Sequence, residues 1–393
     1  MAFAGIRGTG SFGTDERPKN FREYILWKNP NGTAPLFALM AKARKESVND
    51  PEFAWFEEYL DQVRVSINYT TGYDTTIETF TIDADGLKLV AGDVLLAEKA
   101  ITVGTYDHEI MVVSSVTSDT VIVVKRGQAN TTRAAVADGQ YLLKIGSVFA
   151  EGSAKASISA RNPTKVRNYT QIFKTAVGQT NTSQQTKYRT GDAWTNDKKR
   201  RSFDHSRDIE MAILFGKAYE DTSGSHPMRY TAGLRSFYQT NVTAFTTTPT
   251  IDTFMTAIQS VFDWDSEAGD ERIVFCGNGF INSLNKLVRS ETNSEIQFNE
   301  VIQMYGMKLN EFIIPQGRIA IKTHPLMNRN TRYTYSAFIV DPTTLKWRPL
   351  RDTKFEDNIQ TPGTDAREGQ WLTEAGLECE FEKTGGYIEN FVV

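Results

Sequence analysis

The spacing of apolar residues changes along this chain, and each change predicts a different kind of structure. Apolar and polar residues alternate through 62–67 and 76–82, which is typical of β-strands that bury one face. Further short strands are expected at 87–96, 109–116, 120–125 and 140–145. Turn residues separate these runs at regular spacing, so we expect residues 62–150 to form a small β-barrel or β-sandwich.

Residues 195–220 predict one long helix with a polar first half and an apolar second half. Thr195 can act as its N-cap, and Asp197 is favourable in the first turn. Ile209, Ile213 and their apolar neighbours make the second half a core element. The first half offers few apolar side chains, so we expect it to cross solvent or a neighbouring molecule. That pattern favours an assembly subunit over a free-standing enzyme.

After residue 250 the pattern is that of an α/β domain. Thr250 can cap a helix with apolar residues at 251, 254, 255, 258, 261 and 262, which matches the helical period. A strand at 272–276, a tight turn and a helix at 280–288 are expected next. Further strands are predicted at 311–314, 318–322, 333–341 and 345–350, and strands of the tail after 371 should rejoin an earlier sheet.

The remaining segments are expected to be short or extended. The first 35 residues hold many glycines and prolines but also scattered apolar residues, which favours an arm ordered against another subunit over a flexible leader. A short helix or turn is expected at 51–60. Residues 166–177 predict a long strand that returns from an excursion, whose outgoing limb would be 62–70 or 75–83.

The composition excludes several classes of protein. No run of about 18 apolar residues occurs, so no membrane span is expected, and the first residues lack the layout of a signal peptide. The chain has two distant cysteines, Cys276 and Cys379, and four separated histidines. Neither a disulfide framework nor a metal site is therefore expected. The net charge of −4 gives no overall attraction to nucleic acid, so any contact with a polyanion must be local.

Candidate catalytic motifs are few. Gly277 and Gly279 lie between a strand and a helix, but the stretch lacks the third glycine of a dinucleotide fingerprint and the lysine of a P-loop. Cys276 is interpreted as a core residue at the end of an apolar strand. Asp204, His205 and Ser206 cannot converge on one helix, and we expect them on a solvated face. The sequence therefore predicts no enzyme and no cofactor.

One strong basic run occurs, formed by Lys198, Lys199, Arg200 and Arg201. Four consecutive charges surround a helix, so the run can simply be a solvated helix start. It can also contact carboxylates of a partner, or phosphates of nucleic acid without sequence specificity.

The order of these elements resembles the major capsid proteins of tailed bacteriophages, whose fold is shared with the herpesvirus capsid floor. The motifs that carry the resemblance are 21–26 with 34–37 for an N-terminal arm, 122–127 with 131–132 for a strand-rich insertion, 168–173 for a returning limb, 208–217 for a spine helix and 229–234 after it. The resemblance implies an α+β fold with an N-terminal arm, an extended β-hairpin loop, a long spine helix, a peripheral domain and an axial domain, plus a small β-barrel-like insertion.

The resemblance also implies domain limits and contact residues. The arm would be 1–60, the extended loop 61–190 with its insertion at about 84–148, the spine and first peripheral part 191–248, the axial domain 249–344 and the C-terminal peripheral strands 345–393. Contacts between subunits are expected from the basic run 198–201. The extended loop would contribute Tyr169, Gln171 and Phe173. The arm would contribute Phe21, Tyr24, Ile25, Leu26, Trp27, Leu36 and Phe37.

The function implied is that of a major capsid protein, made in the host bacterial cytoplasm and located in the virion capsid. It would self-assemble through hexamers and pentamers into an icosahedral shell that encloses double-stranded DNA. A separate scaffolding protein is expected because no long charged helical leader is seen, together with a portal and room for a decoration protein. Two alternatives are an encapsulin-like compartment shell and a soluble α/β enzyme with a β-domain.

Overall fold

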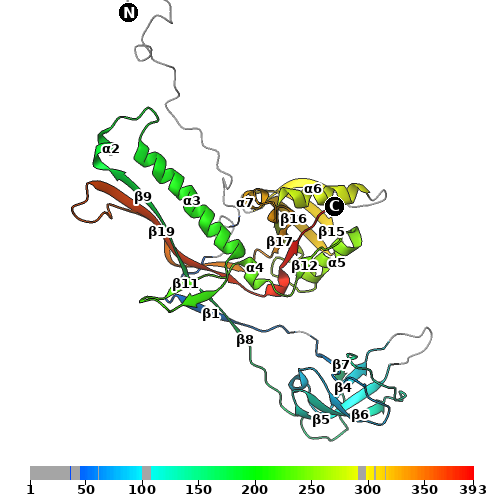
Figure 1. Ribbon diagram of the computed structural model, residues 1–393. Helices are drawn as coiled ribbons and strands as arrows, with labels where there is room; N and C mark the ends of the chain where they lie inside the picture. Colours follow the sequence, from blue (N-terminus) through cyan, green and yellow to red (C-terminus); the bar gives the residue numbers. More distant parts are fainter. Residues whose placement is uncertain are drawn as a thin grey trace, which may run out of the picture. The chain divides into compact units, whose positions relative to one another are not determined.

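The computed structural model describes Leu36 and residues 45–60, 62–99, 108–290, 298–304, 307–314 and 316–393. The chain divides into two compact units (Figure 1). One is Phe56–Lys165, and the other is formed by the chain on either side of it. Among the described residues, no helix is long and apolar enough to cross a membrane.

The smaller unit is a closed six-stranded β-barrel. Its strands follow the order β2-β7-β4-β5-β6-β3, and an antiparallel bridge between Ile67 and Ile82 joins the two ends of that order. Side chains of alternate residues, such as Phe80, Leu95 and Ile122, fill the interior. The predicted barrel is thus confirmed. Its strands are β2 (Arg64–Ser66), β3 (Thr79–Thr81), β4 (Asp93–Ala97), β5 (Ile110–Ser118), β6 (Val121–Gln128) and β7 (Tyr141–Ser147).

The barrel is larger than the predicted insertion at 84–148, because β2 and β3 belong to it. These strands lie in the two segments proposed as the outgoing limb of the extended loop, and that prediction is wrong. The strand paired with β8 (Thr164–Tyr169) is β1 (Glu52–Glu57). The helix or turn expected at 51–60 is therefore also wrong, since Phe53 and Trp55 are buried while the alternate residues Ala54 and Phe56 are exposed.

The larger unit contains a long three-stranded sheet with a helix along one face. The sheet order is β18-β19-β9, and residues 45–48 run beside β18 through a parallel bridge between Lys45 and Trp347. The predicted strand 166–177 is split near Thr170 into β8 and β9. The elements are β18 (Leu345–Asp357), β19 (Ala366–Cys379), β9 (Gln171–Thr180), the short α2 (Asn181–Gln185) and the long α3 (Ala193–Phe215).

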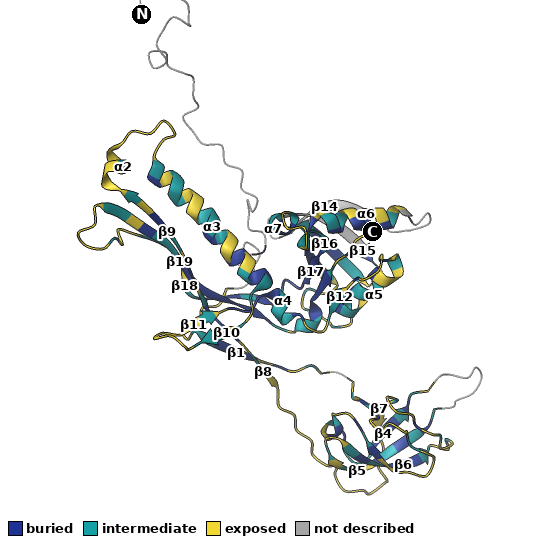
Figure 2. Cartoon of the chain, viewed as in Figure 1, coloured by how far each residue is buried: buried dark blue, intermediate teal, exposed yellow. Residues whose placement is uncertain are grey.

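A seven-stranded mixed sheet forms the rest of the core. Its order is β12-β20-β17-β13-β16-β15-β14, with β13 parallel to β16 and antiparallel to β17. Phe275 packs in the same cluster as Ile213 of α3, and Val274 packs with Phe254 and Leu284 on the opposite face. The sheet is thus covered on both faces, which explains why the last four residues of β13, Ile273–Cys276, are all apolar and buried. Figure 2 shows its central strands as buried.

The elements of this region follow the sequence closely. Thr250 caps α5 as predicted, in a reciprocal capping box with Thr253. The strand expected at 333–341 is instead a 3-10 turn followed by β17. The strands are β12 (Val242–Ala244), β13 (Glu271–Cys276), β14 (Phe298–Met304), β15 (Met307–Ile314), β16 (Gly317–Thr323), β17 (Ala337–Val340) and β20 (Gly386–Glu389); the helices are α4 (Leu234–Phe237), α5 (Ile251–Phe262), α6 (Asn278–Ser290) and α7 (Pro325–Asn328).

The long helix starts and ends earlier than predicted. Asp192, not Thr195, is the N-cap, and its carboxylate accepts the backbone N–H groups of Trp194 and Thr195, each at 3.2 Å. The helix ends at Phe215 because Gly216 leaves the helical conformation, with ψ at 157°. Residue 216 packs closely against another backbone segment, since a Cβ there would lie 2.4 Å from the Thr231 carbonyl oxygen. The chain then forms a hairpin of β10 (Tyr219–Asp221) and β11 (Met228–Tyr230).

Candidate assembly surfaces

The first half of α3 lies on the chain's own sheet, which corrects the expectation that it crosses only solvent or a neighbouring molecule. Lys198 Nζ is 3.8 Å from the centre of the Phe355 ring, and the Lys198 carbonyl accepts the Trp371 indole N–H at 3.2 Å. Trp194 meets Phe355 edge-on. Aromatic residues of β18 and β19 therefore supply the apolar surface that the helix itself lacks, although exposed residues recur along its other side (Figure 2).

His205 connects α3 to all three strands of that sheet. Its Nδ1 lies 3.1 Å from the Thr175 hydroxyl on β9, and its Nε2 lies 2.7 Å from the Thr373 hydroxyl on β19. Thr373 in turn lies 2.8 Å from Thr353 on β18. The solvated position expected for His205 is wrong, since only 2% of the residue is exposed. Burial lowers the pKa of His205, and nearby Asp208 opposes that shift.

The basic run is largely matched by charges of its own helix. Arg200 lies 3.5 Å from Asp197, and Arg201 lies 3.3 Å from Asp204. Lys198 stands over the Phe355 ring, whereas Lys199 is exposed. Pairs of this kind at a helix surface contribute little stability and can be exchanged for other anions. The run remains a hypothesis for contact with a neighbour or with DNA, and Lys198 is the member with a role inside the chain.

The backbone at Leu36 is held by a buried carboxylate. Leu36 lies in the core of the larger unit, in a cluster with Ile209 and Ile213. Its backbone N–H donates to Glu210 Oε1 at 2.9 Å, and His324 Nε2 lies 2.7 Å from the same oxygen. The prediction that Leu36 contacts another subunit is therefore wrong. The other predicted arm residues lie outside the described residues: Phe21, Tyr24, Ile25, Leu26, Trp27 and Phe37.

The three residues expected to contact a neighbour from the extended loop instead face their own chain. Tyr169 and Phe173 are each 8% exposed, and Gln171 Oε1 accepts the Thr231 backbone N–H at 3.2 Å. Odd-numbered residues of β9 face α3, so the even-numbered ones face away from it. Ile172 is accordingly 50% exposed. The strand itself was predicted correctly, but the face of the strand that points away from the chain was assigned wrongly.

Asn168 is a buried connector that the sequence reasoning did not single out. Its side-chain N–H groups donate to the Leu377 carbonyl at 2.6 Å and to the Thr231 hydroxyl at 3.1 Å. Its Oδ1 accepts the backbone N–H groups of Tyr169 and Ala232, both at 2.8 Å. A buried amide with its donors and acceptor occupied ties the end of β8 to β19 and to the segment after β11. A lone asparagine in a strand carries no local signal of such a role.

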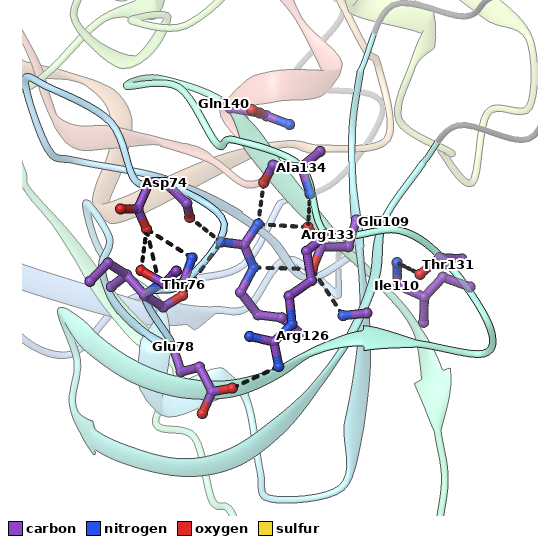
Figure 3. A network of polar contacts seen from close by, with 12 residues as sticks. Asp74, Thr76, Glu78, Glu109, Ile110, Arg126, Thr131, Arg133, Ala134 and Gln140 are labelled. Carbon is purple, nitrogen blue, oxygen red and sulfur yellow. Dashed lines mark hydrogen bonds and ion pairs between the residues drawn. The ribbon is translucent and has the colours of Figure 1, made fainter.

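A second buried network holds two loops to the barrel (Figure 3). Arg126 of β6 and Glu109 form two contacts of 2.6 and 3.0 Å, with both side chains essentially inaccessible. Arg126 also donates to the carbonyls of Asp74 and Ala134. Glu109 accepts the backbone N–H of Ala134 at 3.0 Å. The sequence contained one signal of this buried position. Arg126 follows Ile122 and Val124 at alternate positions of β6, so its side chain lies on the same inward face.

Backbone N–H groups of the strand-to-helix turn at 276–279 donate to side chains of the same chain. The Asn278 N–H donates to the Asn328 side chain at 2.6 Å, and the Gly279 N–H donates to the Thr334 hydroxyl at 3.2 Å. A Cβ at Gly277 would lie 2.2 Å from the Thr334 carbonyl oxygen, so close packing explains this glycine. Burial raises the pKa of the Cys276 thiol, as expected for a core residue.

No cluster of three or more potential metal ligands occurs among the described residues. In the barrel, a groove of about 600 Å³ lies between β5 and residues 157–160. Serine and aliphatic residues line it, without converging charged groups.

The comparisons with known proteins cover nearly the whole chain. The model of the SU10 major capsid protein family matches residues 6–391. The major capsid protein of Pseudomonas phage PaMx41 is 26% identical over 372 residues, which are 92% of this chain and 86% of that one. The capsid of cyanophage A-1(L) aligns with a TM-score of 0.49 at 8% identity, covering 98% of this chain and 100% of that one. The capsid of phage XM1 aligns with a TM-score of 0.48 at 10% identity, covering 97% and 99%.

Proposed function

The chain belongs to the SU10 major capsid protein family, and from this premise we propose that it self-assembles through hexamers and pentamers into an icosahedral shell. It is a phage major capsid protein, so its place is the virion capsid. The observation that carries the proposal is the family match over residues 6–391, which includes both compact units. This match favours a capsid protein over an encapsulin-like shell and over a soluble enzyme.

The proposal extends to what the shell holds and contacts. It would enclose the double-stranded DNA of a tailed phage without reading its sequence, through local cations such as Lys199. Ring closure within a hexamer would use a head-to-tail contact that repeats around the ring. A separate scaffolding protein, a portal and a decoration protein are the further partners we propose, with synthesis in the host bacterial cytoplasm. The peripheral and axial roles of the regions 345–393 and 249–344 belong to the same proposal.

Electron microscopy of the purified full chain tests this function. We expect rings or closed shells, and nucleic acid inside particles that are purified from phage-producing cells. Uniform particles near the 44.2 kDa mass of one chain would contradict assembly. Shells that repeatedly contain protein cargo and no nucleic acid would support the compartment alternative instead.

A further inference from the structure

One side of the barrel is apolar on its outer surface as well as inside. The neighbouring strands β7, β4 and β5 are antiparallel, and such strands usually place apolar side chains inside and polar ones outside. Here the outward positions are apolar too, while the inward positions fill the barrel core. We call this outer surface the β4 face. Its residues are Val94 and Leu96 of β4, Ile110 and Val112 of β5, and Tyr141, Leu143 and Ile145 of β7.

The strand register places these side chains next to one another. Leu96 lies opposite Leu143 on one neighbouring strand and opposite Ile110 on the other. Val94 lies opposite Val112 in the next row. Directly opposed residues of an antiparallel pair project from the same side of the sheet. All five side chains are half-buried in the single subunit, so part of each is open to a partner.

The opposite side of the barrel is more polar. The strand order β2-β7-β4-β5-β6-β3 is closed by the bridge between Ile67 and Ile82, which places β3 across the barrel from β4. The outward residues of β3 are Thr79 and Thr81, and Lys125 of the adjacent β6 is exposed. An apolar outer surface confined to one side is typical of a surface that another molecule covers.

The size of the β4 face indicates what kind of molecule can cover it. Neighbouring strands lie about 4.8 Å apart, and outward residues repeat about every 7 Å along a strand. Three strands with two or three outward residues each therefore offer roughly 200–300 Å², against about 800 Å² per partner in a stable complex. A protein arriving from solution would bind this area weakly. A molecule already held beside the barrel by other contacts can cover it, because its effective concentration is far higher.

The charges beside the β4 face favour a second copy of the same face. Arg64 Nη2 lies 2.6 Å from Glu98 Oε2, and the Arg64 guanidinium stands 3.6 Å over the Tyr141 ring. This balanced pair attracts neither a strongly acidic nor a strongly basic partner. It lets an identical face approach across a two-fold axis without net repulsion between like charges.

We propose that the β4 face pairs with the β4 face of a second copy of this chain, across a two-fold axis beside β4. The inference rests on the proposed function, because assembly holds copies of the chain close together and supplies the remaining contacts. Pairing of identical faces is an isologous contact, distinct from the head-to-tail contact that closes a hexamer. It would bury Leu96 of one copy against Leu96 and Val94 of the other.

Crosslinking of the full-length variant Leu96→Cys tests the pairing. Both native cysteines are buried, so a short bis-maleimide should react at residue 96. We expect at least about tenfold more covalent dimer in assembled particles than in isolated subunits at the same concentration. The matched control is Thr79→Cys on the opposite strand β3, where the parent residue is exposed. Equal dimer yields from the two variants would overturn the pairing.

A charge swap tests the two-fold arrangement. Leu96→Glu and Leu96→Lys should each melt within about 5 °C of the parent, since residue 96 points outward. Either variant alone brings like charges together across the axis, so assembly measured by electron microscopy should fall at least about tenfold. An equal mixture of the two should recover assembly several-fold, which a mere loss of barrel stability would not allow. Thr79→Glu should assemble like the parent. Normal assembly of both Leu96 variants would overturn the pairing.

The outcomes separate the pairing from the proposed function. Particles that form while Leu96→Cys gives no dimer would overturn the pairing and leave the capsid function intact. A different polypeptide bound over residue 96 in the particles would also overturn pairing with a second copy. Dimer found in open rings, without closed shells, would support the pairing and contradict the closed shell.

Discussion

At the scale of single residues, buried polar groups connect segments that are distant in sequence. Asn168, Glu210 and the Glu109–Arg126 pair are all inaccessible, and each has its hydrogen-bonding groups occupied by neighbours. A buried polar group without partners is costly. These residues therefore specify which segments come together rather than merely adding stability.

His205 predicts a stability that depends on pH. Its folded pKa is lowered, so below the unfolded value of about 6.5 the unfolded chain takes up a proton that the folded chain resists. Stability should fall as the pH drops from 7 towards 5, by about 1.4 kcal/mol for each unit of pKa depression. His205→Gln should show a smaller fall over this window in urea unfolding. The exposed His226 provides the control, His226→Gln, which should keep the parent's dependence. An identical pH dependence in His205→Gln and the parent would refute the role of burial.

At the scale of elements, α3 shows how a polar helix can be covered by its own chain. The rings of Phe355 and Trp371 approach its first half from the sheet. The methylene stem and ammonium group of Lys198 can lie over such rings while staying partly hydrated. The amphipathic pattern of the helix alone therefore understates how much of it is packed.

Two lysines that are adjacent in α3 should differ in their effect on stability. Lys198→Gln removes a cation from the Phe355 ring and should lower the free energy of unfolding by about 0.5–1 kcal/mol. Lys199→Gln, at an exposed position, is the matched control and should change it by less than about 0.5 kcal/mol. Urea unfolding of both variants measures the difference. Equal effects would mean that the ring contact contributes nothing specific.

At the scale of the whole molecule, the chain is two units with separate cores. The barrel interior and the core of the larger unit are distinct clusters. Two units with separate cores need not unfold together. A defect in one should be visible without a matching defect in the other.

The variant Arg126→Met tests this division. It leaves Glu109 buried without its partner, which should destabilise the barrel by about 3–5 kcal/mol. We expect two calorimetric transitions in the parent subunit, of which only the barrel transition falls or disappears in the variant. Arg133→Met breaks an exposed pair with Glu78 and should shift that transition far less. A single transition that moves as a whole would show that the units unfold as one.

The sequence alone determined features that depend on neighbours along the chain. Short apolar runs between turn residues located strands β5 and β6, and a capping residue with a helical apolar stripe located α5, because these signals act within a few residues. The motifs around residues 21–37 and 168–234 were enough to indicate the family. The barrel was predicted as a class because regularly spaced strands need a common core.

Only the tertiary structure decided what covers each surface. Alternation shows that one face of a strand is buried but not what it is buried against, so the segments of β2 and β3, which belong to the barrel, were also proposed as the outgoing limb of the extended loop. It also could not reveal that Phe355 and Trp371 cover α3, or that Tyr169 and Phe173 face inward. Pairing partners separated by a hundred residues or more leave no periodic trace, because the contacts that select them form only when the chain folds.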